Sequence, residues 1–548
     1  MPDPIFDPNL APSLAPNLAP SLAPSLAPSL APPLAPWPCD AAARAQAVAR
    51  VARPLAPALH RALVAQNARL AASAARTANL EALGRGAAVV ITGQQVGLFL
   101  GPLYTIYKAA TAVALARVLA AETGRPVVPM FWLQTEDHDL PEIASLGVPG
   151  AAACETVAAP VDAGNRISIA HRRLPPEILG CLDRLSDALG DGALAAAHLE
   201  RLRRHYRPGA GWAEAFAGVL GELFAPEGLV LIDPRDPRDP AIAELAAPIH
   251  ARALDQAGPI AAAMIARCDE LARAGRHVQI YVRPGAPLAF FHPDAADGPR
   301  VRLEPAGDDA FAEVGSGKVH ARAALLAILR DDPRRFSTSA LLRPIVQDTL
   351  LPTVAYVGGP AEVAYFAQLG PVYRAFDRAM PLIVPRAKFR ITDARARKLL
   401  DRLGLVPADL ARPEAELLAG AGNDDAAQIS ARLLAPFLAA HRALAESLGS
   451  EAGPQIARAL AKTRASVERS VGKLASKIER TRLYADAERV DAVRRLRALL
   501  APGGAPQERT LGLAGLAARL GDRHVVERVL AAIDPLAPGS GTLQELAG

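Results

Sequence analysis

The stretch TGQQVGLFLGPLYTIYK, which starts at Thr92, gathers glutamines, glycines, tyrosines and a lysine in a chain otherwise rich in alanine, arginine and proline. Glutamines donate and accept hydrogen bonds, so they suit a phosphate, a carboxylate or a sugar, although solvated glutamines in a turn would read the same. Glycines let a ligand approach the backbone, and the N-terminus of a following helix favours an anion. Tyr104 and Lys108 share one face of that helix, where the lysine either reaches a phosphate or stays in water. The candidate ligand contacts are Thr92, Gly93, Gln94, Gln95, Gly97, Tyr104 and Lys108.

A second group is the run Glu136-Asp137-His138-Asp139, which places three carboxylates and one imidazole in consecutive residues. Like charges this close require a compensating cation or proton, which a Mg²⁺, a substrate ammonium or a shared proton would supply. His138 is a candidate general base or transition-state donor, and the alternative is a structural histidine. No second histidine at a useful spacing accompanies it, which argues against zinc.

A third group surrounds the apolar run TVAYVGG at 353–359. Polar residues before it either bind substrate or brace the strand ends, and glycines and polar side chains follow it. The candidates are Arg343, Gln347, Asp348, Gly358, Gly359, Glu362 and Tyr365.

Buried strands must position these groups. The run 87–92, a helix over 103–122 and the run 126–134 form a strand-helix-strand unit, which predicts a parallel sheet. In such a sheet ligands bind beyond the carboxyl ends of the strands, where the first two groups and the third from Gly358 onward lie. Further strands are predicted at 228–233, 353–359 and 381–385, with a helix at roughly 361–378; an antiparallel hairpin of 277–282 and 287–292 reads as an insertion.

The rest of the chain divides by pattern. Residues 1–39 contain LAP repeats, whose regular prolines predict an extended or disordered tail. Residues 40–392 form the α/β core, with insertions near 150–225 and 275–335. Residues 393–505 are helical: the segments 430–446 and 453–500 are expected to pack as an antiparallel coiled coil, and 506–548 to return to the core.

Composition and charge argue against several classes of protein. The net charge of +5 is spread along the chain, and no strip of basic and aromatic residues indicates nucleic-acid binding. Four unpaired cysteines, no membrane-length apolar run and an N-terminus without a secretory pattern indicate a cytoplasmic protein.

In these motifs the sequence resembles the bacillithiol biosynthesis cysteine-adding enzymes, the BshC family. The matching stretches are TGQQVGLFLGPLYTIYK, FWLQTEDHD, LLRPIVQDTLLPTVAYVGGPAEVAYFAQL, PRAKF and Gln507-Glu508-Arg509. The resemblance implies a Rossmann-like core similar to class I nucleotidyl-transfer enzymes, inserted connecting subdomains and a coiled coil that forms a homodimer.

The resemblance also implies a reaction, the joining of cysteine to the amino group of glucosaminyl-malate. It places Gln94, Gln95 and His138 in the active cleft, with TGQQ where class I enzymes carry their histidine-rich nucleotide signature. Activation of the cysteine carboxylate calls for ATP with Mg²⁺, and no zinc, flavin or NAD is expected. His138 is expected to assist attack by the amine and remove its proton, with Lys108 stabilising negative charge.

Two other functions fit the residues alone. One is a metal-dependent hydrolase or transferase acting on a sugar, with Glu136 to Asp139 as metal ligands. The other is a non-catalytic coiled-coil scaffold with a core that binds a small molecule.

Overall fold

The computed structural model of the chain describes residues 40–150, 153–162, 164–419, 425–449, 453–534 and 543–547. The LAP-repeat tail lies outside these residues. Contacts divide the chain into two compact units, each considered by itself. The first comprises the chain to Val148, Glu155–Ile391 and the segment from Gln507 onward, and the second comprises Thr392–Pro506 with Pro149–Cys154.

The first unit is built on a five-stranded sheet in the order β12-β11-β1-β2-β5, and all of its strand pairs are parallel. The strands are β1 (Ala88–Gln94), β2 (Val127–Leu133), β5 (Val230–Ile232), β11 (Thr353–Gly358) and β12 (Leu382–Pro385). The central strand β1 lies between β2, which follows it in sequence, and β11, which comes much later. The chain therefore reverses its direction of winding beside β1, where open α/β sheets bind their ligands.

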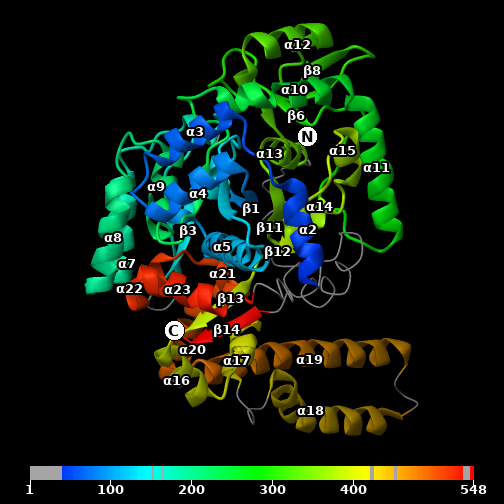
Figure 1. The fold of residues 1–548 in the computed structure, drawn as a ribbon. Helices are drawn as coiled ribbons and strands as arrows, with labels where there is room; N and C mark the ends of the chain where they lie inside the picture. The colour runs from blue at the N-terminus through cyan, green and yellow to red at the C-terminus, as the bar shows by residue number, and fades with distance from the viewer. Residues whose placement is uncertain are drawn as a thin grey trace. The chain divides into compact units, whose positions relative to one another are not determined.

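Helices cover both faces of this sheet (Figure 1). Val89 and Ile91 of β1 pack into a large apolar core on one face, whereas Ala88 and Val90 pack into a smaller core on the other. The helices of the larger core are α3 (Pro57–Asn67), α4 (Ala74–Arg85), α10 (Ala241–Asp255), α11 (Ala257–Arg273), α13 (Arg343–Leu350), α14 (Pro360–Phe366) and α15 (Gly370–Ala375); those of the smaller core are α2 (Ala41–Val51) and α5 (Tyr104–Thr123). This is the Rossmann-like α/β fold that the sequence predicts.

A second sheet, antiparallel and in the order β10-β6-β7-β8-β9, is inserted between β5 and β11. Its strands are β6 (Ala289–Phe291), β7 (Val301–Pro305), β8 (Ala310–Glu313), β9 (Val319–Ala321) and β10 (Phe336–Thr338), and helix α12 (Arg322–Asp331) packs on it. The antiparallel insertion is thus present, but the predicted hairpin is wrong. Residues 277–282 form no strand, because the side chain of Gln368 accepts from the backbone N–H groups of Gln279 and Ile280, both at 3.0 Å.

The remaining elements of this unit lie in two stretches. Between β2 and β5 are α6 (Leu140–Ile143), β3 (Ser145–Pro149), β4 (Cys154–Ala158), α7 (Ile178–Leu189), α8 (Ala193–His205) and α9 (Trp212–Leu223). Near its C-terminal end are β13 (Lys388–Thr392), α21 (Gln507–Thr510), α22 (Ala514–Leu520), α23 (Asp522–Ala532) and β14 (Leu543–Ala547).

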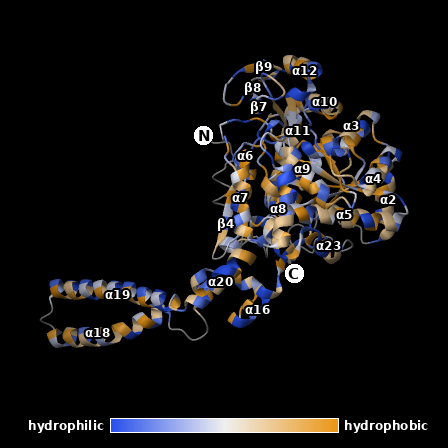
Figure 2. Cartoon of the chain, turned by 90° about the vertical axis from the view of Figure 1, so that its left-hand side faces the viewer, coloured by the Kyte–Doolittle hydropathy of each residue, from blue (hydrophilic) through white to orange (hydrophobic). Residues whose placement is uncertain are grey.

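The second unit is helical. Its helices are α16 (Ala394–Leu403), α17 (Glu414–Leu418), α18 (Ala426–Leu448), α19 (Pro454–Leu483) and α20 (Ala487–Leu500). Helices α18 and α19 lie side by side, with apolar and polar residues interspersed along both (Figure 2). Within the described part of the chain, no helix is both long and apolar enough to cross a membrane.

Two predicted helices are each broken in two. The segment 453–500 is interrupted after Leu483, because the Asp486 side chain accepts from the Arg489 N–H at 2.9 Å and starts a new helix. The helix predicted at 361–378 is divided into α14 and α15. Pro371, in the first turn of α15, has no N–H with which to continue α14.

Candidate active site at the ends of the parallel strands

The predicted polar residues lie at or after the ends of β1, β2 and β11, which are neighbours in the sheet, except Arg343, Gln347 and Asp348, which precede β11. Because the strands are parallel, their carboxyl ends meet at one edge. The structure arranges the predicted residues there in two clusters, one around Lys108 and one around His138.

The Lys108 cluster lies between β1 and β11. The Lys108 ammonium forms an ion pair with Glu362 and donates to the Gly93 carbonyl and to Gln94 Oε1, both at 2.8 Å. Lys108 is only 3% exposed, so the alternative of a solvated lysine is wrong. Burial alone would raise the pKa of Glu362, but Lys108 and hydrogen bonds from Tyr356 and the Gly359 N–H bring it below the ordinary value. Burial also lowers the pKa of Lys108, an effect that the charge and hydrogen bond of Glu362 oppose.

A second buried ion pair lies next to this cluster. Arg386 donates to both carboxylate oxygens of Glu508 at 2.7 Å, and the two residues are 3% and 4% exposed. A Cβ atom on Gly359 would stand 3.4 Å from Glu362 Oε2, 3.8 Å from Lys108 Cε and 3.9 Å from Arg386 Nε. Gly359 thus lies where the two ion pairs, Lys108 with Glu362 and Arg386 with Glu508, come close together. Arg386 also lies 5.7 Å from the ring centroid of Tyr104.

The glycines at the end of β1 and just after it are required by close packing. A Cβ on Gly93 would stand 3.1 Å from the Trp132 carbonyl oxygen, and one on Gly97 would stand 2.9 Å from Gly101 Cα. The N-terminus of α5 is also partly occupied, because the Leu103 N–H donates to the Leu511 carbonyl at 2.8 Å. An anion site on this helix end, as predicted from the sequence, finds no support in these contacts. Thr92 is fully buried and donates to the Val357 carbonyl of β11.

Gln95 joins β1 to the residues after β2. Its amide nitrogen donates to Asp137 Oδ2 at 2.8 Å and to Glu142 Oε2 at 2.7 Å. Asp139 caps helix α6 by accepting from the Glu142 N–H. Gln95 and Asp139 therefore shape the loop after β2.

His138 contacts Arg300, a residue that sequence reasoning missed. Arg300 Nη1 lies 3.0 Å from His138 Nδ1 and 3.4 Å from Asp137 Oδ1. Burial, and then the Arg300 charge, lower the pKa of His138 to about 4, so the imidazole is neutral at neutral pH. Burial would raise the pKa of Asp137, but Arg300 and His138 bring it below its ordinary value. The compensating cation for the acidic run is thus a protein arginine.

The third predicted group braces β11. Arg343 donates to Gln347 Oε1 at 2.7 Å and to the Tyr365 hydroxyl at 2.9 Å, and Gln347 donates to Asp348 at 2.8 Å. Asp348 accepts from Tyr373. Of the two alternatives, the contacts favour bracing over direct binding of substrate. In the same region, a Cβ atom added to Gly358 would stand 3.2 Å from Glu362 Cβ.

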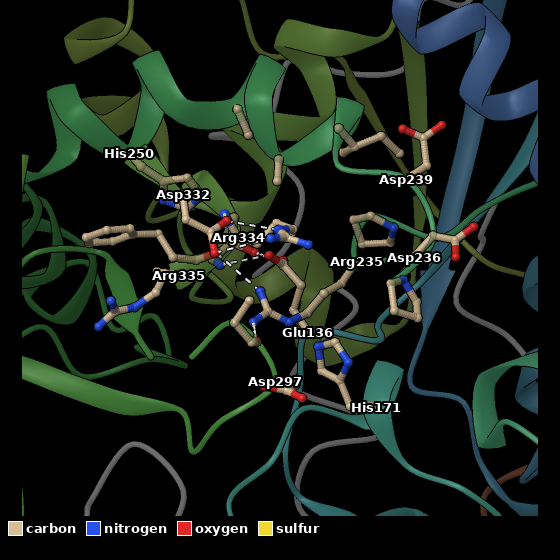
Figure 3. Close-up of a pocket in the computed structure, with 18 of the residues that line it drawn as sticks. Glu136, His171, Arg235, Asp236, Asp239, His250, Asp297, Asp332, Arg334 and Arg335 are labelled. Carbon is tan, nitrogen blue, oxygen red and sulfur yellow. Dashed lines mark hydrogen bonds and ion pairs between the residues drawn. The ribbon is translucent and has the colours of Figure 1, made fainter. Parts of the chain in front are cut away.

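Glu136 lines a cavity of about 520 Å³ (Figure 3). Its carboxylate accepts from the backbone N–H of Thr338 at 3.1 Å and from the Thr338 hydroxyl. The acidic lining residues are Glu136, Asp236, Asp239, Asp294, Asp297 and Asp332, and the arginines are Arg235, Arg334 and Arg335. Carboxylates therefore outnumber guanidinium groups on the cavity wall.

Three side-chain nitrogen atoms that make no hydrogen bond to the described residues belong to residues lining the same cavity. Arg235 Nε, His171 Nε2 and His250 Nδ1 are buried and have no hydrogen-bond partner among the described residues. Burial and the charge of Arg235 lower the pKa of both histidines to about 4, so they are neutral. Burial also lowers the pKa of Arg235, to about 10, which leaves it charged. The wall thus combines carboxylates, a buried guanidinium group and neutral imidazoles.

Metal-ligand geometry is not found in the residues described. There, no group of three or more His, Cys, Asp or Glu residues is arranged to hold a metal ion. The Glu136 carboxylate contacts Thr338, whereas the Asp137 carboxylate contacts Gln95 and Arg300.

Comparison with known proteins identifies the family. Residues 40–387 match the model for "Bacillithiol biosynthesis BshC, N-terminal Rossmann-like domain". A protein of Koribacter versatilis is 41% identical over 63% of this chain and 62% of its own length, and one of Salinibacter ruber is 38% identical over 68% and 67%. Both are named "Putative cysteine ligase BshC". The match thus spans somewhat under two thirds of the first of these relatives. The chain belongs to the bacillithiol biosynthesis BshC family, and residues 40–387 form its Rossmann-like domain.

Proposed function

We propose that this protein is a cysteine ligase that joins the cysteine carboxyl group to the amino group of glucosaminyl-malate. The names of its relatives support the ligase class. In the reaction, the amine nitrogen attacks the carbonyl carbon of an activated cysteine. The new C–N bond replaces the bond from that carbon to the leaving group, which departs with the electron pair, and the amine loses a proton.

ATP with Mg²⁺ is proposed as the source of activation, since phosphorylation or adenylation turns the carboxylate oxygen into a leaving group. The Lys108 cluster is the proposed site for such an anion. Lys108 and Arg386 lie close to Gly359, each paired with a carboxylate, and Lys108 also fixes Gln94 and the end of β1. These residues would bind and orient negatively charged oxygen atoms there.

The cavity beside Glu136 is proposed to bind the amine acceptor, and its lining is the observation that carries the assignment. Glucosaminyl-malate, the acceptor implied by the family, has an ammonium group and carboxylates. The excess of acidic side chains suits the ammonium, and Arg235 suits a carboxylate. A volume of about 520 Å³ lies in the range for ligands of this size.

The direct test of the reaction is a mass spectrum. The full-length protein is incubated with cysteine, glucosaminyl-malate, ATP and Mg²⁺, and the cysteinyl amide is expected together with AMP or ADP. AMP indicates adenylation and ADP an acyl phosphate. Absence of the amide, with protein shown to be folded and to bind both substrates, would contradict the proposed reaction.

Glu136→Gln tests the acceptor site. The glutamine oxygen still accepts from the Thr338 N–H, so the fold should persist while the negative charge is lost. The KM for glucosaminyl-malate is expected to rise about 10- to 100-fold, since a hydrogen bond to a charged group contributes about 1.5–3 kcal/mol. The KM for cysteine serves as the internal control and should stay unchanged. An equal rise in both constants would place the acceptor elsewhere.

A homodimer formed through the α18–α19 pair is also proposed, in the cytoplasm. Leu433, Leu444, Ile456 and Leu474 on these helices are 38%, 50%, 44% and 49% exposed. These exposed apolar side chains support a surface on the helix pair that packs against another copy.

A further inference from the structure

The contact between Arg300 and His138 determines which nitrogen of the imidazole carries the proton. A guanidinium group donates hydrogen bonds and accepts none. Arg300 Nη1 lies 3.0 Å from His138 Nδ1, so Nδ1 must present its lone pair. In a neutral imidazole the proton then lies on Nε2.

Arg300 is fixed firmly enough to impose this choice. It is 4% exposed, and its Nε donates to Ser337 Oγ at 3.2 Å and its Nη2 to the Thr338 carbonyl at 2.6 Å. Its guanidinium carbon lies 3.7 Å from the ring centroid of Phe290. The antiparallel insertion thus places Arg300 at the end of β2, with its guanidinium nitrogens already in hydrogen bonds.

The other nitrogen of His138 is available to a ligand. Among the residues described, Nε2 has no hydrogen-bond partner, whereas the histidine side chain is 15% exposed. The charged groups that influence the ring are Arg300, Asp137, Arg166 and Arg172. Three of these four are cations, which disfavour a second proton on the ring and keep it neutral.

We propose that Arg300 is a positioning residue that holds His138 as an Nε2–H hydrogen-bond donor, aimed at an anionic oxygen of the activated cysteine or its leaving group. The inference rests on the proposed ligase function and changes the role of the histidine. His138 stabilises negative charge as it develops, and the proton lost by the amine passes to solvent. The general-base role expected from the sequence would require the lone pair on Nε2.

The position of the proton on the His138 ring can be measured by NMR without any reaction. Full-length protein containing ¹⁵N-labelled histidine is examined by NMR, and the His138 signals are assigned by their loss in His138→Gln. The Nε2–H tautomer is expected throughout pH 5.5–8. In Arg300→Met, a mixture of tautomers and a higher pKa for His138 are expected. An Nδ1–H tautomer in the wild type would overturn the inference, as would a His138 titration that Arg300→Met leaves unchanged.

The activity test compares three substitutions of His138. The amide nitrogen of glutamine takes the place of Nε2 and that of asparagine the place of Nδ1, and neither accepts a proton at neutral pH. His138→Gln is expected to keep kcat within about 10-fold of the wild type, whereas His138→Asn and His138→Ala lose about 100-fold or more, the usual cost of one transition-state donor. Glutamine and alanine variants of equal, low kcat would overturn the donor role.

A failure of the proposed ligase function and a failure of the tautomer inference give different results. A protein that makes no amide from cysteine contradicts the proposed function, yet its NMR spectrum still reports the tautomer. If Arg300→Met does not fold, the wild-type spectrum and the three His138 variants still decide the inference.

Discussion

Lys108→Met is expected to destabilise the first unit by about 3–5 kcal/mol, since it leaves the Glu362 carboxylate, whose side chain is only 14% exposed, without its cation. Glu362 would keep its hydrogen bonds from Tyr356 and the Gly359 N–H, but these do not neutralise the charge. The Gly93 carbonyl and Gln94 would lose their common donor as well. Urea unfolding of the full chain measures the effect.

The double variant Lys108→Met/Glu362→Gln separates folding from function. It removes both charges while glutamine still accepts from Gly359, so most of the lost stability is expected to return. Activity should stay down by about 100-fold or more if Lys108 stabilises charge in the transition state. Lys398→Met is the matched control, because Lys398 is exposed on α16 and should change neither quantity. Full recovery of activity in the double variant would give Lys108 a purely structural role.

Glu508→Gln is expected to have the second large effect. It leaves Arg386 buried and near Lys108 without a carboxylate, at an expected cost of about 3–5 kcal/mol in the free energy of unfolding. The same short segment carries Gln507, which accepts from the Ile391 N–H, and Leu511, whose carbonyl accepts from Leu103. Losing the pair should therefore loosen the connection between β1 and α5 and reduce activity.

Hydrogen exchange of the backbone around Leu103 reports this coupling. Faster exchange at Leu103 is expected in Glu508→Gln, together with a lower urea midpoint. Arg386→Met/Glu508→Leu replaces the pair by apolar side chains and should regain most of the stability, because no unpaired charge is left buried. If Glu508→Gln were as stable as the wild type, the ion pair would not hold this segment in place.

Most of the scaffold follows from the sequence. The apolar runs that became β1, β2, β5, β11 and β12 lie between helical segments, and this alternation specifies a parallel sheet with its polar residues at one edge. The predictions failed where a single side chain redirects the backbone. Gln368 takes the hydrogen bonds that a strand at 277–282 would need, and Asp486 starts a new helix within a continuous helical pattern.

The sequence by itself determined which strand ends carry polar residues and that the acidic run around His138 needs a cation. Tertiary structure alone decided which cation that is. Arg300 lies in an arginine-rich chain with no motif around it, and it reaches His138 only because the antiparallel insertion folds over the end of β2. The same holds for the pairing of Lys108 with Glu362 and of Arg386 with Glu508. Charges far apart in sequence act together only when burial removes water from between them, and burial is a property of the folded chain.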